Sequence, residues 1–322
     1  MIAVDDYAEF LATEYLDSYV AGGGAAVKFV VAGEAADADR FSQTVRDRAA
    51  RREYATVRVD AVDIRIHMMD QLFFAVAAQV DWEALAARRV RAAYAAIAHP
   101  IPDDAGDISV EAVAAHHQVD PGELTRDVNR HLQRTVFHDY AMVQEFRIAM
   151  LRLCQAQLRT GQVTEAEHVA VLNWLRGELR QISVLRSAMI FRRIGRHNAR
   201  QLLFSLAHWL AVNGRAGLFI ELDVRRFGFA RRPQPDERHG IYYTKSALLD
   251  GYELLRQLVD NTDELAHCCV VVTAAPEFTS DTARGVDAYQ ALKLRIYDDV
   301  RDRNRDNPYS SLIRLGSPGA AA

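Results

Sequence analysis

A single glycine followed by small and charged residues stands between a short apolar run and a polar stretch of helical character. The apolar run covers residues 26–32, the glycine is Gly33, and residues 34–40 read Glu-Ala-Ala-Asp-Ala-Asp-Arg. A glycine-rich turn in this position can wrap a phosphate with backbone N–H groups, while a following lysine and a Ser or Thr hydroxyl hold phosphate charge and magnesium. The chemistry to consider here is therefore nucleotide binding.

The residues that such a phosphate-binding loop (P-loop) needs are replaced in this chain. Ala38 stands in place of the second glycine, Asp39 in place of the lysine, and Arg40 in place of the hydroxyl. Carboxylates close to a triphosphate repel it by on the order of 1 kcal/mol each. The sequence predicts a vestigial nucleotide site, although a plain strand-to-helix turn with acidic residues near the helix N-terminus explains this segment equally well.

Two other apolar runs end in polar residues that such a site would use. Residues 217–222 end at Asp223, the form of a Walker B strand whose Asp orients magnesium, but Val224 replaces the glutamate that would polarise water. Residues 268–272 end at Thr273, where ATPases of the AAA+ kind keep a phosphate-sensing group. Either residue alone is also an ordinary strand end. The candidate site residues are Gly33, Asp39, Arg40, Asp223 and Thr273, with Asp223 as the metal ligand if magnesium binds.

These residues need a scaffold in which strand ends meet, and the patterning of the chain predicts one. Apolar runs of strand length alternate with longer stretches of helical period, which is typical of a parallel sheet flanked by helices. We expect an α/β fold of the P-loop NTPase (AAA+ or ASCE-like) type with a helical insertion. Strands are expected at 26–32, 54–60, 217–223 and 268–273, and helices at 5–19, 37–52, 67–98, 244–265 and 287–303.

The predicted organisation has four parts. Residues 1–98 form the first half of the core, 99–190 a helical insertion or subdomain, 191–315 the second half of the core, and 316–322 a disordered tail. The chain has 322 residues, 50% of them hydrophobic and 25% charged, as in an ordinary globular protein. It has no apolar run of membrane-spanning length and no basic secretory leader, so we expect a cytoplasmic protein without membrane contact. Its three cysteines are expected to be buried thiols.

The formal net charge of −4 gives no global reason to bind nucleic acid, but arginines cluster locally. Residues 109–132 are similar to a helix-turn-helix, whose second helix carries Arg126 and Arg130. Surface salt bridging is the competing explanation for the arginine clusters within residues 186–200 and 225–232. The candidates for contacts with nucleic acid or a protein partner are Arg192, Arg193, Arg196, Arg225 and Arg226, and the candidates for an arginine finger are Arg295 and Arg301.

Several segments along the chain carry a resemblance to a known family. They are residues 19–29, 67–71, 222–226, 242–244, 249–257, 272–278, 289–296 and 307–309. In these segments the chain resembles the small ATP-binding protein of BREX bacteriophage-exclusion systems. The resemblance implies a P-loop ATPase fold and a place in an anti-phage defence system.

Three functions remain open from the sequence. The preferred one is a degenerate, non-catalytic P-loop protein that binds other defence-system proteins in a complex and needs no cofactor. The first alternative is a working ATPase, a switch or motor that binds ATP and magnesium through Arg40 and Asp223. The second is a DNA-binding regulator that uses the helix-turn-helix-like segment.

Overall fold

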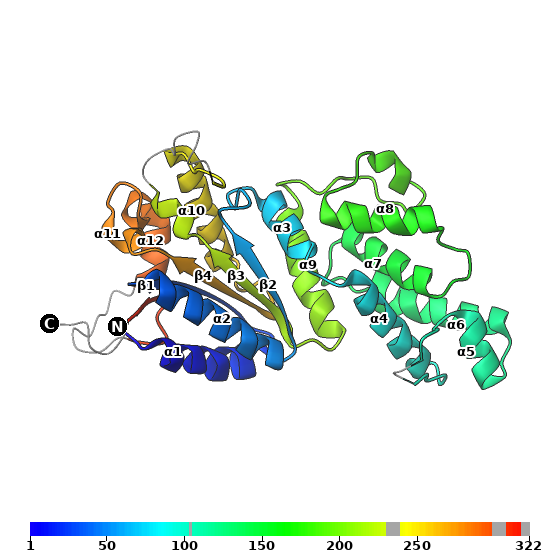
Figure 1. The fold of residues 1–322 in the computed structure, drawn as a ribbon. Coiled ribbons are helices and arrows are strands. Elements are labelled where there is room, and N and C mark those ends of the chain that lie inside the picture. The colour runs from blue at the N-terminus through cyan, green and yellow to red at the C-terminus, as the bar shows by residue number, and fades with distance from the viewer. Residues whose placement is uncertain (103–104, 230–238, 298–306, 317–322) are drawn as a thin grey trace. The chain divides into compact units, whose positions relative to one another are not determined.

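Five parallel strands form one sheet in the order β2-β3-β4-β1-β5. The computed structural model of the chain describes residues 1–102, 105–229, 239–297 and 307–316. Because every pairing is parallel, all carboxyl ends of the strands lie at one edge of the sheet. The strands are β1 (Ala25–Ala32), β2 (Tyr54–Asp60), β3 (Gly217–Asp223), β4 (Cys268–Ala274) and β5 (Leu312–Leu315) (Figure 1).

The chain divides into two compact units. The sheet unit comprises Met1–Val76 and Leu210–Ala322, and the helical unit comprises Ala77–Trp209. The helical unit extends beyond the segment 99–190 that was expected to form an insertion, because it also includes α4 (Trp82–Ala96) and most of α9 (Ala199–Val212).

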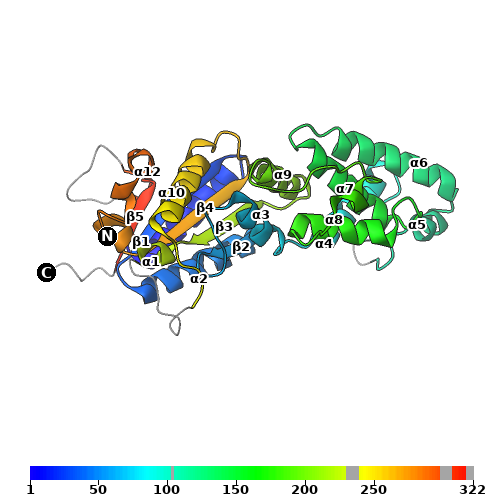
Figure 2. The same cartoon turned by 90° about the horizontal axis from the view of Figure 1, so that it is seen from above.

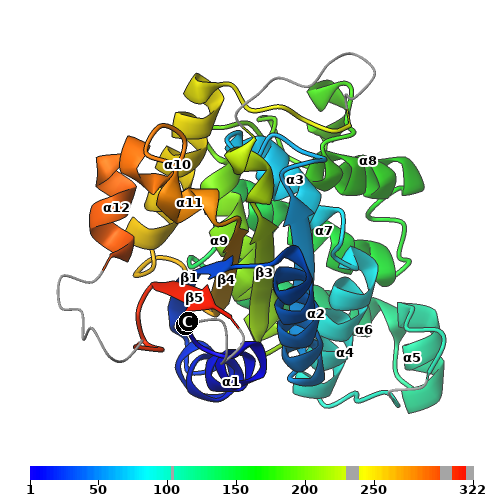
Figure 3. The same ribbon diagram turned by 60° about the vertical axis from the view of Figure 1, so that its left-hand side comes forward.

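Helices cover both faces of the sheet in the sheet unit. Figure 3 shows α1 and α2 on one face and α10, α11 and α12 on the other. Each residue of β1, β3 and β4 is buried, as expected for central parallel strands covered on both sides. The helices are α1 (Val4–Phe10), the π-helix η1 (Leu11–Val20), α2 (Ala35–Arg51), α3 (Met69–Ala77), α10 (Lys245–Asp260), α11 (Glu277–Ser280) and α12 (Gln290–Ile296).

The alternation of side chains along β1 gives each face its own core. Ala26 and Val30 join Phe41 of α2 in a buried cluster with α1 and η1. On the opposite face, the ring of Phe29 stacks on Phe278 at 5.9 Å between centroids. Figure 2 shows α10 passing over this second face.

The helical unit has a core of its own. Its buried side chains include Phe146 on α7 and Trp82 on α4, whose rings are 6.1 Å apart. The helices are α4 (Trp82–Ala96), α5 (Val110–His117), α6 (Pro121–Leu132), the π-helix η2 (Gln133–Phe137), α7 (Gln144–Gln157), α8 (Glu165–Arg176), the 3-10 helix η3 (Ile182–Leu185) and α9 (Ala199–Val212), which ends in the sheet unit.

The structure corrects several expected elements. The helix expected at 67–98 is two helices, α3 and α4, and Asp81 caps the second by accepting a hydrogen bond from Ala84 N at 3.0 Å. Strand β5 was not predicted. The last helix begins at Gln290 rather than 287, and its expected end lies outside the described residues, as does most of the expected tail (317–322).

The three cysteines are buried and free, as predicted. Burial raises the pKa of Cys154 and of Cys269 to about 12, so these thiols stay protonated at neutral pH. None of the helices in the described part of the chain has the length and apolarity needed to span a membrane.

Candidate functional site

The carboxyl ends of the strands border a cavity of about 600 Å³. Open parallel sheets bind ligands in this position, beyond the carboxyl ends of adjacent strands whose connections run to opposite faces. Strands β1 and β4 meet this condition, since α2 follows β1 on one face and α11 follows β4 on the other. The residues that line the cavity are Ala35, Asp60, Val62, Asp223, Arg225, Arg226, Gly228, Phe229, Ala275 and Glu277.

The junction between β1 and α2 is too short to be a phosphate loop. Only Gly33 and Glu34 separate the strand from the helix, which begins at Ala35. Gly33 does not have a positive φ, and a Cβ placed on it would meet no atom within 4 Å. The plain strand-to-helix turn, which the sequence analysis left open, therefore describes this backbone.

The candidate residues Asp39 and Arg40 both lie on α2, and their side chains take different partners. Asp39 Oδ1 is 2.8 Å from Arg225 Nη2 at the edge of the cavity. Arg40 Nη2 is 2.8 Å from Asp5 Oδ2 of α1, and the Arg40 side chain is 55% exposed. The structure therefore brings Asp39, but not Arg40, to the carboxyl end of β3.

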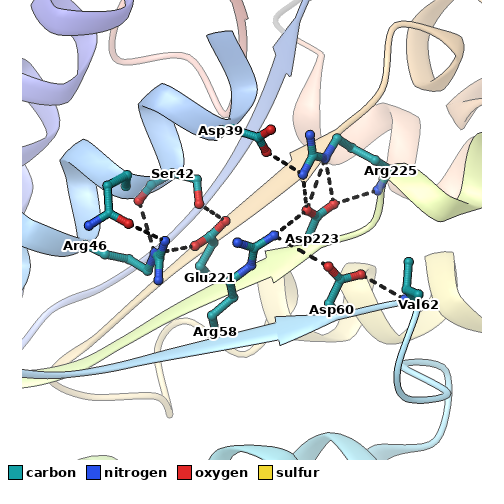
Figure 4. A network of polar contacts seen from close by, with 10 residues as sticks. Asp39, Ser42, Arg46, Arg58, Asp60, Val62, Glu221, Asp223 and Arg225 are labelled. Atoms are coloured by element: carbon teal, nitrogen blue, oxygen red, sulfur yellow. Dashed lines mark hydrogen bonds and ion pairs between the residues drawn. The ribbon is translucent and has the colours of Figure 1, made fainter. Parts of the chain in front are cut away.

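Asp223 ends β3 as predicted, and two arginines hold its carboxylate (Figure 4). Arg225 Nη2 is 2.6 Å from Oδ2, and Arg225 Nε is 3.0 Å from both carboxylate oxygens. Arg58 Nη2 donates to Oδ2 at 3.1 Å from β2. The hydrogen bonds to Asp223 raise the pKa of Arg225 further above its usual value, so the guanidinium is always charged.

Glu221 lies two residues earlier on the same face of β3 and is fully buried. The hydroxyl of Ser42 donates to Glu221 Oε1, and Arg46 Nε is 2.9 Å from Oε2. Burial raises the pKa of Glu221, while the hydrogen bond from Ser42 and the charges of Arg58 and Arg46 oppose that rise.

The neighbouring strand β2 completes the network. Arg58 pairs in register with Glu221, and Asp60 pairs with Asp223. Asp60 Oδ1 accepts the N–H of Val62 at 2.8 Å. Burial raises the pKa of the Asp60 carboxyl.

One face of α2 supplies the rest of the network. Asp39, Ser42 and Arg46 recur at three- and four-residue spacing, which places them on one side of the helix. Figure 4 shows this side turned toward Glu221 and Asp223 of β3. The polar network therefore ties α2 to β3 and β2 at the cavity.

The profile of the family described as BREX system ATP-binding protein BrxC/D matches residues 12–318. The chain belongs to this family. No curated protein and no solved structure matched the chain.

In this member of the BREX ATP-binding family, the residues at the strand ends do not fit a magnesium–nucleotide pair. Magnesium keeps a near-ideal octahedron of water and carboxylate oxygens, but the oxygens of Asp223 are bonded to guanidinium groups. Asp39 of α2 brings a further carboxylate to this edge of the sheet, where it pairs with Arg225. Each carboxylate of the network has a guanidinium nitrogen within 3.5 Å, and these carboxylates belong to Asp39, Asp60, Glu221 and Asp223.

Thr273 of this BREX family member lies next to Asp223, since the two residues pair in register between β4 and β3. Its side chain is fully buried, and Thr273 Oγ1 has no hydrogen-bond partner among the described residues. Thr273 is the penultimate residue of β4, and its function as a phosphate-sensing group stays a prediction.

The other candidate arginines lie apart from this site or donate hydrogen bonds to backbone carbonyl groups. Arg226 donates to the carbonyl oxygens of Ile241 and His239 at 2.8 and 2.7 Å. Arg295 pairs with Asp260 at 3.0 Å, and Arg301 lies outside the described residues. The remaining candidates, Arg192, Arg193 and Arg196, are exposed in the helical unit.

The helix-turn-helix-like segment does form two helices, α5 and α6, but its arginines are engaged locally. Arg126 pairs with Glu123 at 3.7 Å and Arg130 with Asp127 at 2.9 Å, both within α6. In the described ranges, no group of three or more His, Cys, Asp or Glu residues is placed to hold a metal ion.

Sequence reasoning missed the partners of Asp223 and Glu221. Arg58 places a charge at a polar position of the alternating strand 54–60, on the same face of the sheet as Glu221, and this was the available signal. Ser42 and Arg46 gave no such signal, because polar residues on a helix between apolar ones normally face solvent.

Proposed function

We propose that the chain is a non-catalytic, P-loop-derived subunit that binds other proteins of a BREX phage-defence complex. Three observations support a P-loop origin. The sheet is parallel, β1 is followed directly by α2, and the ends of β1, β4 and β3 lie side by side with Asp223 at the end of β3. Family membership supports the place in a BREX system.

The observation that carries the proposal is that two guanidinium groups, of Arg225 and Arg58, are hydrogen-bonded to the carboxylate of Asp223. A magnesium ion at Asp223 would have to displace Arg225 from contacts of 2.6 to 3.0 Å. A displaced Arg225 would lose Asp223 and keep the carboxylate of Asp39 as its partner. The magnesium ion would compensate the charge of Asp223, but it would have to offset the loss of the hydrogen bonds from Arg225.

The β1–α2 junction supports the same conclusion. A triphosphate is normally held by several backbone N–H groups of an extended loop. Here the residues that would form that loop are already helical from Ala35 onward, so their N–H groups beyond the first turn are bonded within α2.

A working ATPase is the alternative, and it makes a different structural demand. It needs Arg40 to serve the nucleotide together with Asp223. Arg40 instead pairs with Asp5 on the surface, so this function requires α1 and α2 to exchange their contact for one with the ligand.

Calorimetric titration with ATP and magnesium, combined with a phosphate-release assay, separates the two functions. We expect no binding at nucleotide concentrations up to about 1 mM, which corresponds to less than about 4 kcal/mol. Asp223→Ala is the test variant, Asp223→Asn preserves its shape, and Asp250→Ala removes an exposed carboxylate on α10 as the control. Micromolar binding with turnover that Asp223→Ala abolishes and Asp250→Ala leaves intact would refute the proposal.

The partner part of the proposal has its own test. Purification of the full chain from its native operon, followed by mass spectrometry, is expected to recover other BREX components in stoichiometric amounts. Recovery of the chain alone under mild salt conditions would count against a scaffold function.

A further inference from the structure

We infer that an ordered surface segment of the helical unit, residues 182–197, binds single-stranded nucleic acid. We call it the Arg–Phe segment. This inference is independent of the proposed function, because the segment lies in the helical unit whereas the cavity and its network lie in the sheet unit.

The segment lies in a stretch of unusual charge. Between Glu178 and Glu221 the chain has no Asp or Glu and no Lys, but seven arginines. The whole chain carries 43 acidic residues among 322, so 42 consecutive residues without one is a marked local bias. Arginine favours phosphate because its planar guanidinium forms two parallel hydrogen bonds to phosphate oxygens and also stacks on planar rings.

Exposed arginines and exposed apolar side chains occur together along the segment. Met189 and Phe191 are each 60% exposed, far more than is usual for large apolar residues. The Arg192 side chain is 73% exposed, and Arg186, Arg193 and Arg196 are also exposed. Among the described residues, Glu145 pairs with this series, at 3.9 Å from Arg192 Nε.

The backbone of the Arg–Phe segment is fixed even though these side chains point to solvent. Three of its own residues, Leu185, Ala188 and Ile190, are fully buried and anchor it. Trp174 Nε1 donates to the carbonyl of Arg192 at 2.9 Å, and Ile190 N donates to the carbonyl of Leu185 at 3.1 Å. The exposed groups are therefore presented by an ordered support, which lowers the entropy cost of binding.

Met189 adds a second indication. It has a φ of 63°, the left-handed conformation that is uncommon for a residue other than glycine. Such backbone outliers persist where the surroundings impose them, and they cluster at functional positions. Here the outlier turns the chain between the buried Ala188 and Ile190 and leaves the Met189 side chain in solvent.

These features favour a single strand over a duplex or a protein. Non-specific single-strand sites combine a basic track for the backbone with aromatic rings on which unstacked bases lie. Duplex recognition uses a helix or a two-stranded ribbon in a groove, and residues 190–195 form neither. The core of a protein interface is apolar and depleted of charge, whereas Met189 and Phe191 lie between the exposed Arg186 and Arg192.

Fluorescence anisotropy with a labelled oligo-dT of 20 nucleotides tests the inference on the full chain. We expect salt-sensitive binding, weakened about tenfold or more by Phe191→Ala through loss of stacking. Arg192→Ala with Arg196→Ala should weaken binding and lower the slope of log Kd against log salt by about 1.4, for two phosphate contacts. The side chains are exposed, so thermal unfolding should match that of the unmodified chain.

Matched variants elsewhere serve as controls. Tyr19→Ala removes a ring that is 54% exposed in the sheet unit, and Arg126→Ala with Arg130→Ala removes two exposed arginines of α6. Neither should change the affinity. The inference is overturned if the unmodified chain fails to bind oligo-dT at about 50 mM salt, where such contacts are strong. It is also overturned if the Phe191→Ala variant binds oligo-dT as tightly as the unmodified chain. Equal affinity for duplex DNA, or displacement by polyglutamate at equal charge, would also overturn it, the latter in favour of an acidic protein partner.

Discussion

Buried hydroxyl groups at the carboxyl end of the sheet differ in whether they have partners, and this difference can be measured. Ser42 donates to Glu221, whereas Thr273 Oγ1 has no partner among the described residues. A buried hydroxyl without a hydrogen bond costs about 1–3 kcal/mol. We predict that Thr273→Val, which keeps the shape, raises the free energy of unfolding by about 1 kcal/mol.

Ser42→Ala is the matched control for this prediction, because it removes a hydroxyl that is used. It should lower the free energy of unfolding by about 1–3 kcal/mol, since the buried Glu221 loses a donor. Denaturant unfolding of both variants gives the comparison. A Thr273→Val variant as destabilised as Ser42→Ala would show that the Thr273 hydroxyl has a bonded role that the structure does not display.

The carboxyl of Glu221 predicts a pH dependence of stability. Burial raises its pKa above the usual 4.5, so the folded chain binds this proton more tightly than the unfolded chain does. Its favourable contribution is complete below the unfolded pKa and is lost as pH rises through the folded pKa. Glu221→Gln lacks this titration. The difference in unfolding free energy, unmodified chain minus Glu221→Gln, should therefore fall as pH rises from about 4 to about 8.

Equilibrium unfolding of both proteins across that pH range checks the sign. Other groups titrate in both proteins and cancel in the difference, provided that the pairing of Arg46 is the only other contact changed. A difference that grows with pH would mean that the hydrogen bond from Ser42 and the charges of Arg58 and Arg46 outweigh burial and lower the pKa of Glu221 instead.

At the scale of elements, the buried Lys28 explains how β5 is held on the sheet. Lys28 is 4% exposed, and its Nζ donates to the carbonyl oxygens of Tyr309 and Ser310 at 2.7 and 3.1 Å. The same ammonium lies 4.3 Å from the centroid of the Tyr15 ring of η1. These contacts fix the residues immediately before β5, next to its partner β1.

We predict that Lys28→Met lowers the free energy of unfolding by about 2–4 kcal/mol, because two carbonyl groups lose charged hydrogen bonds. Hydrogen exchange should show the loss of protection first at β5. Lys245→Met, at an exposed position on α10, is the control and should change little. Unchanged protection of β5 in Lys28→Met would refute this function of the lysine.

The elements that could be predicted from sequence are determined by residues close together in the chain, and the elements that were missed depend on other contacts. Strands β2 and β3 were predicted with the observed bounds, because each is an apolar or alternating run between turn residues. Strand β5 was missed because it has four residues and is defined by pairing with β1, nearly 300 residues earlier. The break before α4 was missed because apolar spacing continues across it, and only the Asp81 cap marks it.

The same distinction applies to the candidate site. Asp223 was predicted because a carboxylate after an apolar strand is a local pattern. Arg225 was proposed as a contact for nucleic acid or a partner, but the structure engages it with Asp223 and Asp39. Its pairing with Asp39 depends on α2 lying beside β3, which short-range patterns do not specify, whereas Asp223 is close to it in the sequence.

At the scale of the whole molecule, the two compact units predict separable responses to loss of core volume. Phe29 of β1 and Phe146 of α7 are both fully buried, the first in the sheet unit and the second in the helical unit. Replacing either by alanine should cost about 3–5 kcal/mol, since a large cavity is left behind. Because each unit has a core of its own, Phe146→Ala should reduce hydrogen-exchange protection in α4 and α7 while β1 and β4 keep theirs, and Phe29→Ala should do the reverse. Uniform loss of protection from either variant would mean that the chain unfolds as one cooperative body, and that the helical unit is not an independent folding unit.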